Sequence, residues 1–381
     1  MEKAHSRLRV AFIVGTLRQG GAEKQLVYMA QALHRAGVEV RIYSLTQGEH
    51  YESALRAEGI PICWFGRIGS PVVRLGALSR QLRAFHPHIL QASHFFMNLY
   101  SSLAGRLHGA LDIGSLRSDL VHEFEILGAW GPVLLRLPSV ILANAEAAKR
   151  NAAGSSKAPD KIFIVANAID IADFDRRAAQ SVPSLSAPGE IIVVAAGTLL
   201  PVKRFDLFLS ALALARRECA QLKGVLIGDG PEMSALQERA CALGLIPDGL
   251  TFLGRRNEIP ALLRQAAMLL LTSDHEGFPN VILEAMAARL PIIATPAGDV
   301  GAIVQNEATG YVVPFNDTGA MARRMVELAH APALRRQFGV AGRARVEQCY
   351  SFEDLADRLL ASYRAMALKQ NRAALLSLLG K

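Results

Sequence analysis

The segment EIIVVAAGTL, residues 190–199, restarts the pattern with which the chain begins. Its apolar, β-branched run ends in glycine and threonine, and a segment of helical period, FDLFLSALALARREC (205–219), follows. The chain opens in the same way, with LRVAFIVGTL (8–17) and then EKQLVYMAQALHRAG (23–37). Short apolar runs that alternate with helical segments predict βα units and parallel sheets. Because the pattern begins twice, we predict an α/β protein with two doubly wound, Rossmann-like domains.

The chain length agrees with two domains and a linker. With 381 residues, the chain exceeds the size at which a single hydrophobic core usually stops growing. Residues 176–190, RRAAQSVPSLSAPGE, are rich in Ser, Pro and Ala and have no apolar period, which predicts a linker. We therefore expect a first domain over residues 1–175 and a second over residues 191–350.

The end of the chain, residues 351–381, predicts a long helix. Ser351, with Asp354 three positions later, comes close to a capping box that would open this helix. No predicted strand follows, so we expect the helix to pack on a domain already formed.

Composition indicates a globular protein of a reducing compartment. Hydrophobic residues make up 51% and charged residues 20% of the chain. The four cysteines have no CxxC spacing, which argues against a zinc site. No apolar run is long enough to span a bilayer, and the N-terminal residues lead into a strand without a secretory segment, so we expect a cytoplasmic protein.

The net charge of +8 lies mostly in the first half of the chain. Residues 1–180 carry 21 Lys and Arg against 15 Asp and Glu, which leaves +6 there. Such a surface attracts a phosphorylated substrate, anionic lipid or nucleic acid, or simply keeps the protein soluble.

Ligands of open α/β sheets bind beyond the carboxyl ends of the strands, so the loops after strands are the candidate sites. Gly20 and Gly21 follow the first strand and stand directly before a helix, where unpaired amides attract an anion. A plain tight turn explains these glycines equally well. The loop is not GxGxxG, and no acidic residue follows the second strand at the spacing that a ribose would need, which disfavours a nicotinamide dehydrogenase.

In the second half, GTLLPVKRFD (197–206) places Lys203 and Arg204 before a helix. Cations are unfavourable at a helix start unless an anionic ligand is present. The alternative is that both side chains simply point into water. Gly228 ends the next strand, in IGDGPE, at a similar position.

EGFPNVILEA (276–285) places Glu276 in a loop ahead of a helix, with Glu284 four positions after Asn280 on one helix face. Carboxylates accept hydrogen bonds from hydroxyl groups such as those of ribose and sugars. Favourable charge near a helix start is the structural alternative.

EGFPNVILEAMAARLPIIAT (276–295) resembles the E-x7-E signature of retaining GT-B glycosyltransferases of family 4. Other motifs of that family occur in the expected order along essentially the whole chain. They are GGAE, HILQASH, VANAID, GTLLPVKRFD, IGDGPE, FLGRRNEI and TGYVVP. The resemblance implies the GT-B fold, in which two Rossmann-like domains face each other across a cleft and a C-terminal helix crosses back to the first domain. It also implies an enzyme that moves a sugar from a UDP- or GDP-linked donor to a glycan, polysaccharide or lipid-linked acceptor, with retention and without a metal or other cofactor.

The resemblance assigns roles to particular residues. Lys203 would bind the donor diphosphate, Glu276 the donor sugar and Glu284 the ribose, while His94 would lie near the reacting sugar. Further donor-binding residues would be Gly20, Gly21, Gly197, Thr198, Arg204, Gly228, Gly254 and Arg255, together with the segment Gly277, Phe278, Pro279, Asn280 and Val281.

Two departures from the family pattern affect the donor site. Thr198 stands where an arginine is usual, and Arg204 stands where a glycine usually follows the lysine. Arg204 would restore the missing charge if its side chain pointed the same way as that of Lys203. The alternatives are a catalytically inactive GT-B partner in a membrane-associated polysaccharide assembly complex, and a UDP-sugar epimerase. We expect peripheral contact with an anionic inner membrane face and no nucleic-acid partner.

Overall fold

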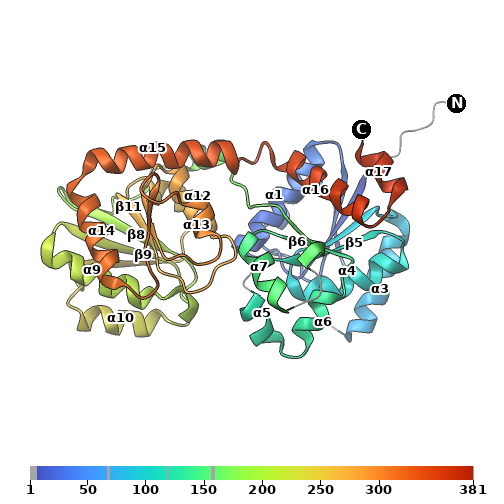
Figure 1. Ribbon diagram of the computed structural model, residues 1–381, viewed down its shortest axis with the longest axis horizontal. Helices are drawn as coiled ribbons and strands as arrows, with labels where there is room; N and C mark the ends of the chain where they lie inside the picture. Colours follow the sequence, from blue (N-terminus) through green and yellow to red (C-terminus); the bar gives the residue numbers. More distant parts are fainter. Residues whose placement is uncertain (1–6, 67–68, 118–119, 156–158, 381) are drawn as a thin grey trace. The chain divides into compact units, whose positions relative to one another are not determined.

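The computed structural model describes residues 7–66, 69–117, 120–155 and 159–380. Its contacts divide the chain into two units, one formed by residues 1–168 and 352–381 and the other by residues 169–351. Each unit is built on one parallel sheet with helices packed against it (Figure 1). The predicted α/β class with two Rossmann-like sheets is therefore confirmed.

In its described residues, the first unit has a seven-stranded sheet in the order β3-β2-β1-β4-β5-β6-β7. The strands are β1 (Arg9–Val14), β2 (Glu39–Ser44), β3 (Ile62–Trp64), β4 (Ile89–Ala92), β5 (Leu111–Leu116), β6 (Val140–Ala143) and β7 (Ile162–Ile164). The helices are α1 (Gly21–Arg35), α2 (Glu52–Ala57), α3 (Pro71–Phe85), α4 (Asn98–Leu107), α5 (Leu120–Leu127), α6 (Trp130–Arg136), α7 (Glu146–Ser155), α16 (Leu355–Lys369) and α17 (Ala373–Leu379), with short 3-10 turns η1 (Phe95–Met97) and η2 (Pro159–Lys161).

Both faces of the first sheet are buried. In β1, Val10 and Phe12 pack in a cluster with α1 and α16, whereas Ala11 and Ile13 pack in another with α3 and α4. A parallel strand that is covered on both sides reads as a continuous apolar run. This burial explains why LRVAFIVGTL shows no alternation of polar and apolar residues.

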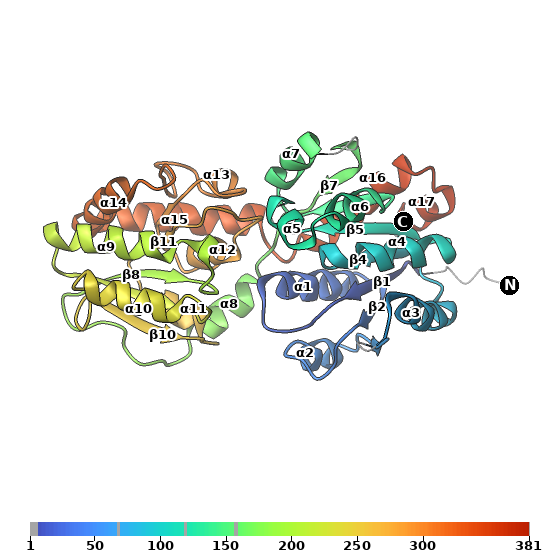
Figure 2. The same ribbon diagram turned by 90° about the horizontal axis from the view of Figure 1, so that it is seen from below.

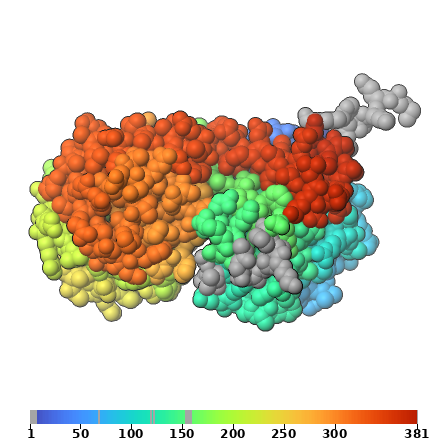
Figure 3. Space-filling view, viewed as in Figure 1, coloured from blue at the N-terminus to red at the C-terminus, as the bar shows by residue number. Residues whose placement is uncertain are grey.

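The C-terminal helices belong to the first unit. Leu359, Tyr363 and Met366 of α16 are buried in the cluster that α1 helps to form, and α16 lies beside α1 (Figure 1). The Tyr363 hydroxyl donates a hydrogen bond of 2.6 Å to Gln91 of β4. Burial of each such side chain stabilises the fold by about 1.5–3 kcal/mol. In Figure 3, the residues of α16 and α17, in red, cover part of the surface of this unit.

The capping box expected at Ser351 and Asp354 is wrong. Helix α16 begins only at Leu355, and within the described residues the Asp354 side chain accepts no capping hydrogen bond from it. Ser351 instead forms a parallel bridge with Ile169, so its backbone is extended. Pairing between distant segments has taken precedence over the local capping pattern.

The described residues of the second unit form a six-stranded sheet in the order β10-β9-β8-β11-β12-β13. The strands are β8 (Ile191–Ala196), β9 (Leu222–Ile227), β10 (Leu250–Gly254), β11 (Met268–Leu271), β12 (Ile292–Ala294) and β13 (Gly310–Val312). The helices are α8 (Ile171–Ala178), α9 (Phe205–Glu218), α10 (Met233–Ala242), α11 (Ile259–Leu263), α12 (Asn280–Ala287), α13 (Val300–Ile303), α14 (Thr318–His330) and α15 (Pro332–Cys349), with a 3-10 turn η3 (Pro201–Lys203).

Helices pack on this sheet through an apolar cluster, and a buried arginine joins two of the helices to each other. Phe208 of α9, Leu236 of α10 and Met325 of α14 share a cluster, and Figure 2 shows α9 beside α10. Arg343 of α15 is buried and donates to the Asp175 carboxylate of α8 at 2.7 and 2.8 Å. These hydrogen bonds join α8 to the second unit.

The division between the units falls between residues 168 and 169, earlier than the domain end expected at residue 175. Residues 179–190 contain no helix or strand. The Leu185 amide donates to the Gln265 side chain at 2.8 Å, so the segment expected to be a linker contacts the second unit.

Candidate functional site

In the second unit, two predicted site residues meet where the strand order reverses. The chain continues from β8 to β9 on one side and later returns to β11 on the other side of β8. The crevice at the carboxyl ends of such neighbouring strands is where ligands of open α/β sheets bind. Lys203 follows β8 and Glu276 follows β11, and Nζ of the lysine lies 2.6 Å from Oε1 of the glutamate. The fold thus assembles an ion pair at this switch point.

Hydrogen bonds hold the Lys203–Glu276 pair in place. The Ser273 hydroxyl donates to the same Oε1 of Glu276 at 2.7 Å. The Thr272 hydroxyl donates to the carbonyl of Lys203 at 2.9 Å, so the two loops are also tied through the backbone. The side chains of the lysine and glutamate are 25% and 10% exposed. An ammonium group has three donors, so this lysine can bind an anion while it keeps the glutamate contact.

Gly298, which was not among the predicted site residues, supports the loop that carries Glu276. Its φ is +58°, and a Cβ added there would lie 2.3 Å from the Glu276 carbonyl oxygen and 2.5 Å from that of Gly277. The amide of Asp299 donates to the Gly277 carbonyl at 3.2 Å. Glycine is therefore needed both for the backbone conformation and for the close approach. The glycine that ends LPIIATPAG was the only sequence signal for this contact.

The glycines after β8 and β9 are packed against each other. A Cβ at Gly228 would lie 1.8 Å from the Gly197 carbonyl oxygen, and the Gly228 amide donates to the Gly254 carbonyl at 2.9 Å. These contacts give Gly228 a structural reason to be glycine. Its role in approaching a ligand stays a prediction.

The remaining predicted residues lie at the same edge of the second sheet. Helix α12 begins at Asn280, with Pro279 as its N-cap. Phe278 is buried and packs edge-on against Tyr350, with 5.5 Å between ring centroids, whereas Gly277 and Val281 are half-buried. Glu284 is half-buried in α12. After the strands β8 and β10, Thr198 and Arg255 are exposed.

The structure does not bring the Arg204 side chain to the Lys203–Glu276 pair. Its guanidinium donates to Asp206 (Nε–Oδ1 3.0 Å), to Asp274 (Nη1–Oδ2 3.0 Å) and to Asn316 (Nη1–Oδ1 2.9 Å). The hydrogen bond with Asp206, together with that to Asp274, raises the pKa of this arginine. Its φ is +49°, in the left-handed region, which costs a non-glycine residue about 1–2 kcal/mol.

The first unit repeats this arrangement at its own switch point, between β1 and β4. Gly20 is the N-cap of α1 and Gly21 its first residue, and Glu23 lies in the first turn. His94 follows β4, and its Nε2 lies 3.3 Å from Oε1 of Glu23. His94 was predicted from the sequence to lie at this site, whereas Glu23 was given no role there.

Hydrogen bonds to Nδ1 define the tautomer of His94. The Gly15 amide, which can only donate, lies 3.4 Å from Nδ1, and the Ser93 hydroxyl lies 2.7 Å from it. Because Nδ1 accepts, the proton of the neutral ring belongs on Nε2, where it faces Glu23. The Phe96 ring stacks on the imidazole at a centroid distance of 5.5 Å. The histidine is therefore oriented on three sides.

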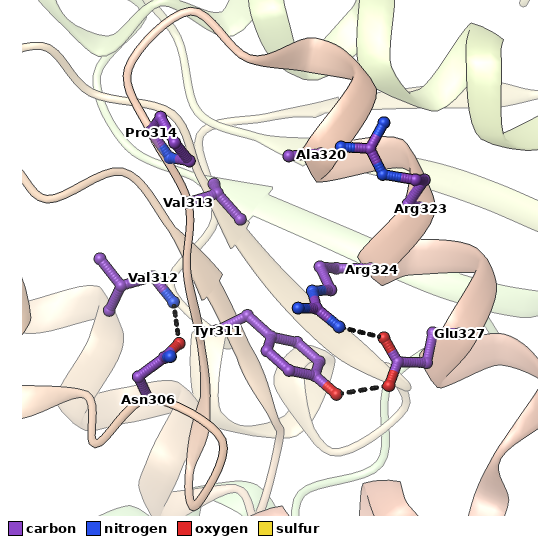
Figure 4. Close-up of a pocket in the computed structure, with 9 residues that line it drawn as sticks. All are labelled: Asn306, Tyr311, Val312, Val313, Pro314, Ala320, Arg323, Arg324 and Glu327. Carbon is purple, nitrogen blue, oxygen red and sulfur yellow. Dashed lines mark hydrogen bonds and ion pairs between the residues drawn. The ribbon is translucent and has the colours of Figure 1, made fainter.

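A cavity of about 400 Å³ lies elsewhere in the second unit, between β13 and α14 (Figure 4). None of the predicted site residues lines it. Its polar groups pair with one another, since Glu327 accepts from the Tyr311 hydroxyl at 2.6 Å and from Arg324 at 2.7 Å. Over the described ranges, no group of three or more His, Cys, Asp or Glu side chains is placed to hold a metal ion.

Two protein-family models match the chain. The model described as Glycosyltransferase Family 4 matches residues 19–173, and that described as Glycosyl transferases group 1 matches residues 177–345. The matched ranges contain His94, Lys203 and Glu276.

Curated relatives match over part of their length. N-acetyl-alpha-D-glucosaminyl L-malate synthase of Bacillus anthracis is 30% identical over 174 residues, which are 46% of this chain and 45% of that protein. D-inositol 3-phosphate glycosyltransferase of Rhodococcus opacus (strain B4) is 33% identical over 226 residues, 56% of this chain and 50% of that protein. The chain thus spans about half the length of these curated relatives.

Solved structures match over nearly the whole chain. Anabaena HepE in complex with UDP-glucose has a TM-score of 0.81 and 19% identity, and the match covers 94% of this chain and 100% of that one. A glycosyltransferase from Rickettsia africae has a TM-score of 0.78 and 18% identity, over 95% and 99% of the two chains. At these identities the likeness shows a shared fold.

Proposed function

The chain belongs to glycosyltransferase family 4 and has the fold class of GT-B enzymes, and from this premise we propose that it transfers a sugar from a nucleoside-diphosphate sugar to an acceptor hydroxyl with retention of configuration. The observation that carries the proposal is the Lys203–Glu276 pair, 2.6 Å apart at the switch point of the second sheet. A cation for phosphate and a carboxylate for sugar hydroxyls are the two groups that such a donor requires.

Lys203 stabilises the leaving group in this proposal. Departure of a nucleoside diphosphate concentrates negative charge on the phosphate oxygens, and donors placed there in advance lower the barrier most. The ammonium group of Lys203 is held by Glu276, so it keeps its position without the donor. Helix α12 begins at Asn280, shortly after Glu276 in the chain, and its N-terminus would add partial positive charge on the same side of the proposed donor site.

Glu276 binds the sugar rather than attacking it. Its carboxylate accepts from Lys203 and Ser273, which lowers its nucleophilicity and leaves lone pairs for sugar hydroxyls. We therefore favour front-face attack by the acceptor hydroxyl, whose proton passes to the departing phosphate. Lys203 supplies positive charge at the diphosphate, so the proposed reaction needs no divalent metal. Unchanged turnover in EDTA is the corresponding expectation.

Solved structures support a class of donor, whereas the names of the relatives do not specify the class of acceptor that is proposed here. HepE of Anabaena was solved with UDP and with UDP-glucose, which favours a UDP-linked donor here over a GDP-linked one. The names of the relatives specify L-malate and D-inositol 3-phosphate. For this chain we propose a glycan, polysaccharide or lipid-linked acceptor.

Peripheral membrane contact is a second part of the proposal. Ile126, Trp130 and Val133 of α5 and α6 expose 65%, 63% and 45% of their surface. No helix in the described part of the chain is long and apolar enough to cross a membrane. An exposed Trp beside aliphatic side chains suits the interfacial region of a bilayer. Sedimentation with anionic vesicles tests this proposal, and loss of binding in Trp130→Ser is expected.

Incubation of the protein with a panel of nucleotide sugars tests the proposed reaction. Transfer to an added acceptor, or slow donor hydrolysis without one, supports a transferase. Formation of a sugar epimer instead assigns the protein to the epimerases. A protein that is folded but binds no nucleotide sugar is the inactive partner of an assembly complex.

Glu284→Ala is expected to weaken nucleotide binding about 10- to 100-fold, because hydrogen bonds to a charged group contribute roughly 1.5–3 kcal/mol. Calorimetry with the preferred nucleotide measures this effect. Glu238→Ala, on the exposed face of α10, is the matched control. Equal affinities in the two variants would contradict the ribose assignment.

Glu23→Gln is expected to lower turnover roughly tenfold while donor affinity stays unchanged, because it removes the charge that orients a histidine through its ring N–H. Steady-state kinetics separate kcat from KM. Glu58→Gln, a first-unit glutamate that pairs with Arg35, serves as the control. A turnover equal to that of the control would show that Glu23 does not orient His94 for the reaction.

A further inference from the structure

Arg204 occupies a backbone conformation that favours glycine. Its φ of +49° lies in the left-handed region, and it is the C-cap of η3 and the N-cap of α9. A non-glycine residue keeps such a strained backbone conformation only where its contacts compensate for the strain. Arg204 directly follows Lys203, so its contacts act next to the proposed diphosphate site.

The guanidinium of Arg204 joins three segments of the second unit. It binds Asp206 in the first turn of α9 through Nε and Nη2, at 3.0 and 3.2 Å. Through Nη1 it binds Asp274, two residues before Glu276, at 3.0 and 3.3 Å. The same nitrogen donates to Asn316, after β13, at 2.9 Å. The loops that carry Lys203 and Glu276 are thereby held to each other by one side chain.

The backbone reinforces this junction. The Asp274 amide donates to the Val202 carbonyl at 2.9 Å, immediately before Lys203. The Arg204 side chain is 27% exposed, and those of Asp206 and Asp274 are 35% and 32% exposed. Such contacts are strong enough to fix geometry at the surface because both carboxylates and the guanidinium act as one network.

We propose that Arg204 is a positioning residue that sets the distance between Lys203 and Glu276 by clamping their two loops through Asp274. The proposal rests on the function proposed above. It also gives a role to an arginine in the loop after β8 whose side chain is directed to Asp206 and Asp274 and not to the Lys203–Glu276 pair. Its nitrogens donate to two carboxylates and one amide. If the side chain left these partners to bind a phosphate, the two unpaired carboxylates would repel that anion.

The effect of Asp274→Asn separates a clamp from a direct ligand. If Arg204 clamps the loops, this substitution weakens the clamp, and the affinity for the nucleotide diphosphate, measured by calorimetry with UDP and GDP, falls about tenfold. If Arg204 instead binds the diphosphate, removal of its competing anion raises the affinity. A rise in affinity overturns the proposal.

Arg204→Gly provides the second measurement. Glycine relieves the left-handed strain but removes the clamp, so we expect the melting temperature to stay close to that of the unsubstituted protein while nucleotide affinity and kcat fall about tenfold or more. In the Arg204→Gly background, Asp274→Asn is expected to cause no further loss, because the contact is already absent. An additive second loss, or an affinity that falls only in parallel with the melting temperature, overturns the clamp.

The unsubstituted protein distinguishes failure of this inference from failure of the proposed function. If it binds neither nucleotide and hydrolyses no nucleotide sugar, the proposed function fails. If it binds and turns over a donor while both substitutions leave affinity and kcat unchanged, only the positioning role of Arg204 fails.

Discussion

Lys203→Ala is expected to lower sugar transfer about 10²- to 10³-fold, the effect of removing one preorganised donor from a developing anion. The lysine lies 2.6 Å from Glu276 and is proposed to meet the leaving diphosphate. Its side chain is 25% exposed and that of Glu276 is 10% exposed, so removal of the ammonium group leaves a largely buried carboxylate and should also cost stability, on the order of 3 kcal/mol. Initial rates of donor turnover and a melting curve measure the two effects separately.

Lys223→Ala is the matched control for Lys203→Ala. Lys223 also pairs with a glutamate of the second unit, Glu190, at 3.3 Å, but it lies near the start of β9 and therefore toward the opposite edge of the sheet. Its removal should leave transfer unchanged. Equal rates in the two variants would remove Lys203 from the mechanism.

Gly298→Ala is expected to abolish nucleotide binding and to destabilise the second unit by about 2–4 kcal/mol, through left-handed strain and overpacking together. The new methyl group would meet the Glu276 carbonyl oxygen at 2.3 Å, and that atom belongs to rigid backbone. The loop must therefore move, and the carboxylate that holds Lys203 moves with it. Thermal unfolding with and without nucleotide measures both consequences.

Gly301→Ala controls for the removal of a glycine in the same region. It lies in α13, and a Cβ there meets nothing within 4 Å. Alanine in a helix is favoured over glycine by roughly 0.5–1 kcal/mol, so this variant should keep or slightly gain stability. Retention of nucleotide-induced stabilisation by Gly298→Ala would show that the loop tolerates displacement.

The two units place similar chemistry at corresponding positions. In each, the segments that follow two neighbouring strands at the reversal of strand order bring a nitrogen group and a carboxylate together, His94 with Glu23 and Lys203 with Glu276. In both pairs the carboxylate orients the nitrogen group. Orientation before the ligand arrives reduces the reorganisation that the reaction would otherwise require.

Much of the candidate site was predictable because topology dictates it. Apolar runs with glycine-containing ends predicted the parallel strands, and the carboxyl ends of parallel strands share one edge of a sheet. The sequence therefore located the loops of Lys203, Glu276 and His94. It did not reveal that the lysine and glutamate contact each other, since 73 positions separate them along the chain.

Local patterns misled where distant contacts were stronger. Ser351 and Asp354 resembled a helix cap, but pairing with Ile169 keeps Ser351 extended. Arg204 looked like a replacement for the arginine absent at Thr198, yet Asp206 and Asp274 draw its side chain elsewhere. The direction of a long side chain depends on partners that no short motif contains.

The sequence by itself determined the α/β class, the doubling of the fold and the strand ends at which a ligand would bind, because hydrophobic period and glycine placement are local properties. Only the tertiary structure decided which charged groups meet. It paired Lys203 with Glu276, oriented His94 by Glu23 and assigned Arg204 to Asp274. These contacts join segments that are far apart in the chain, and only the folding of the sheets brings such segments together.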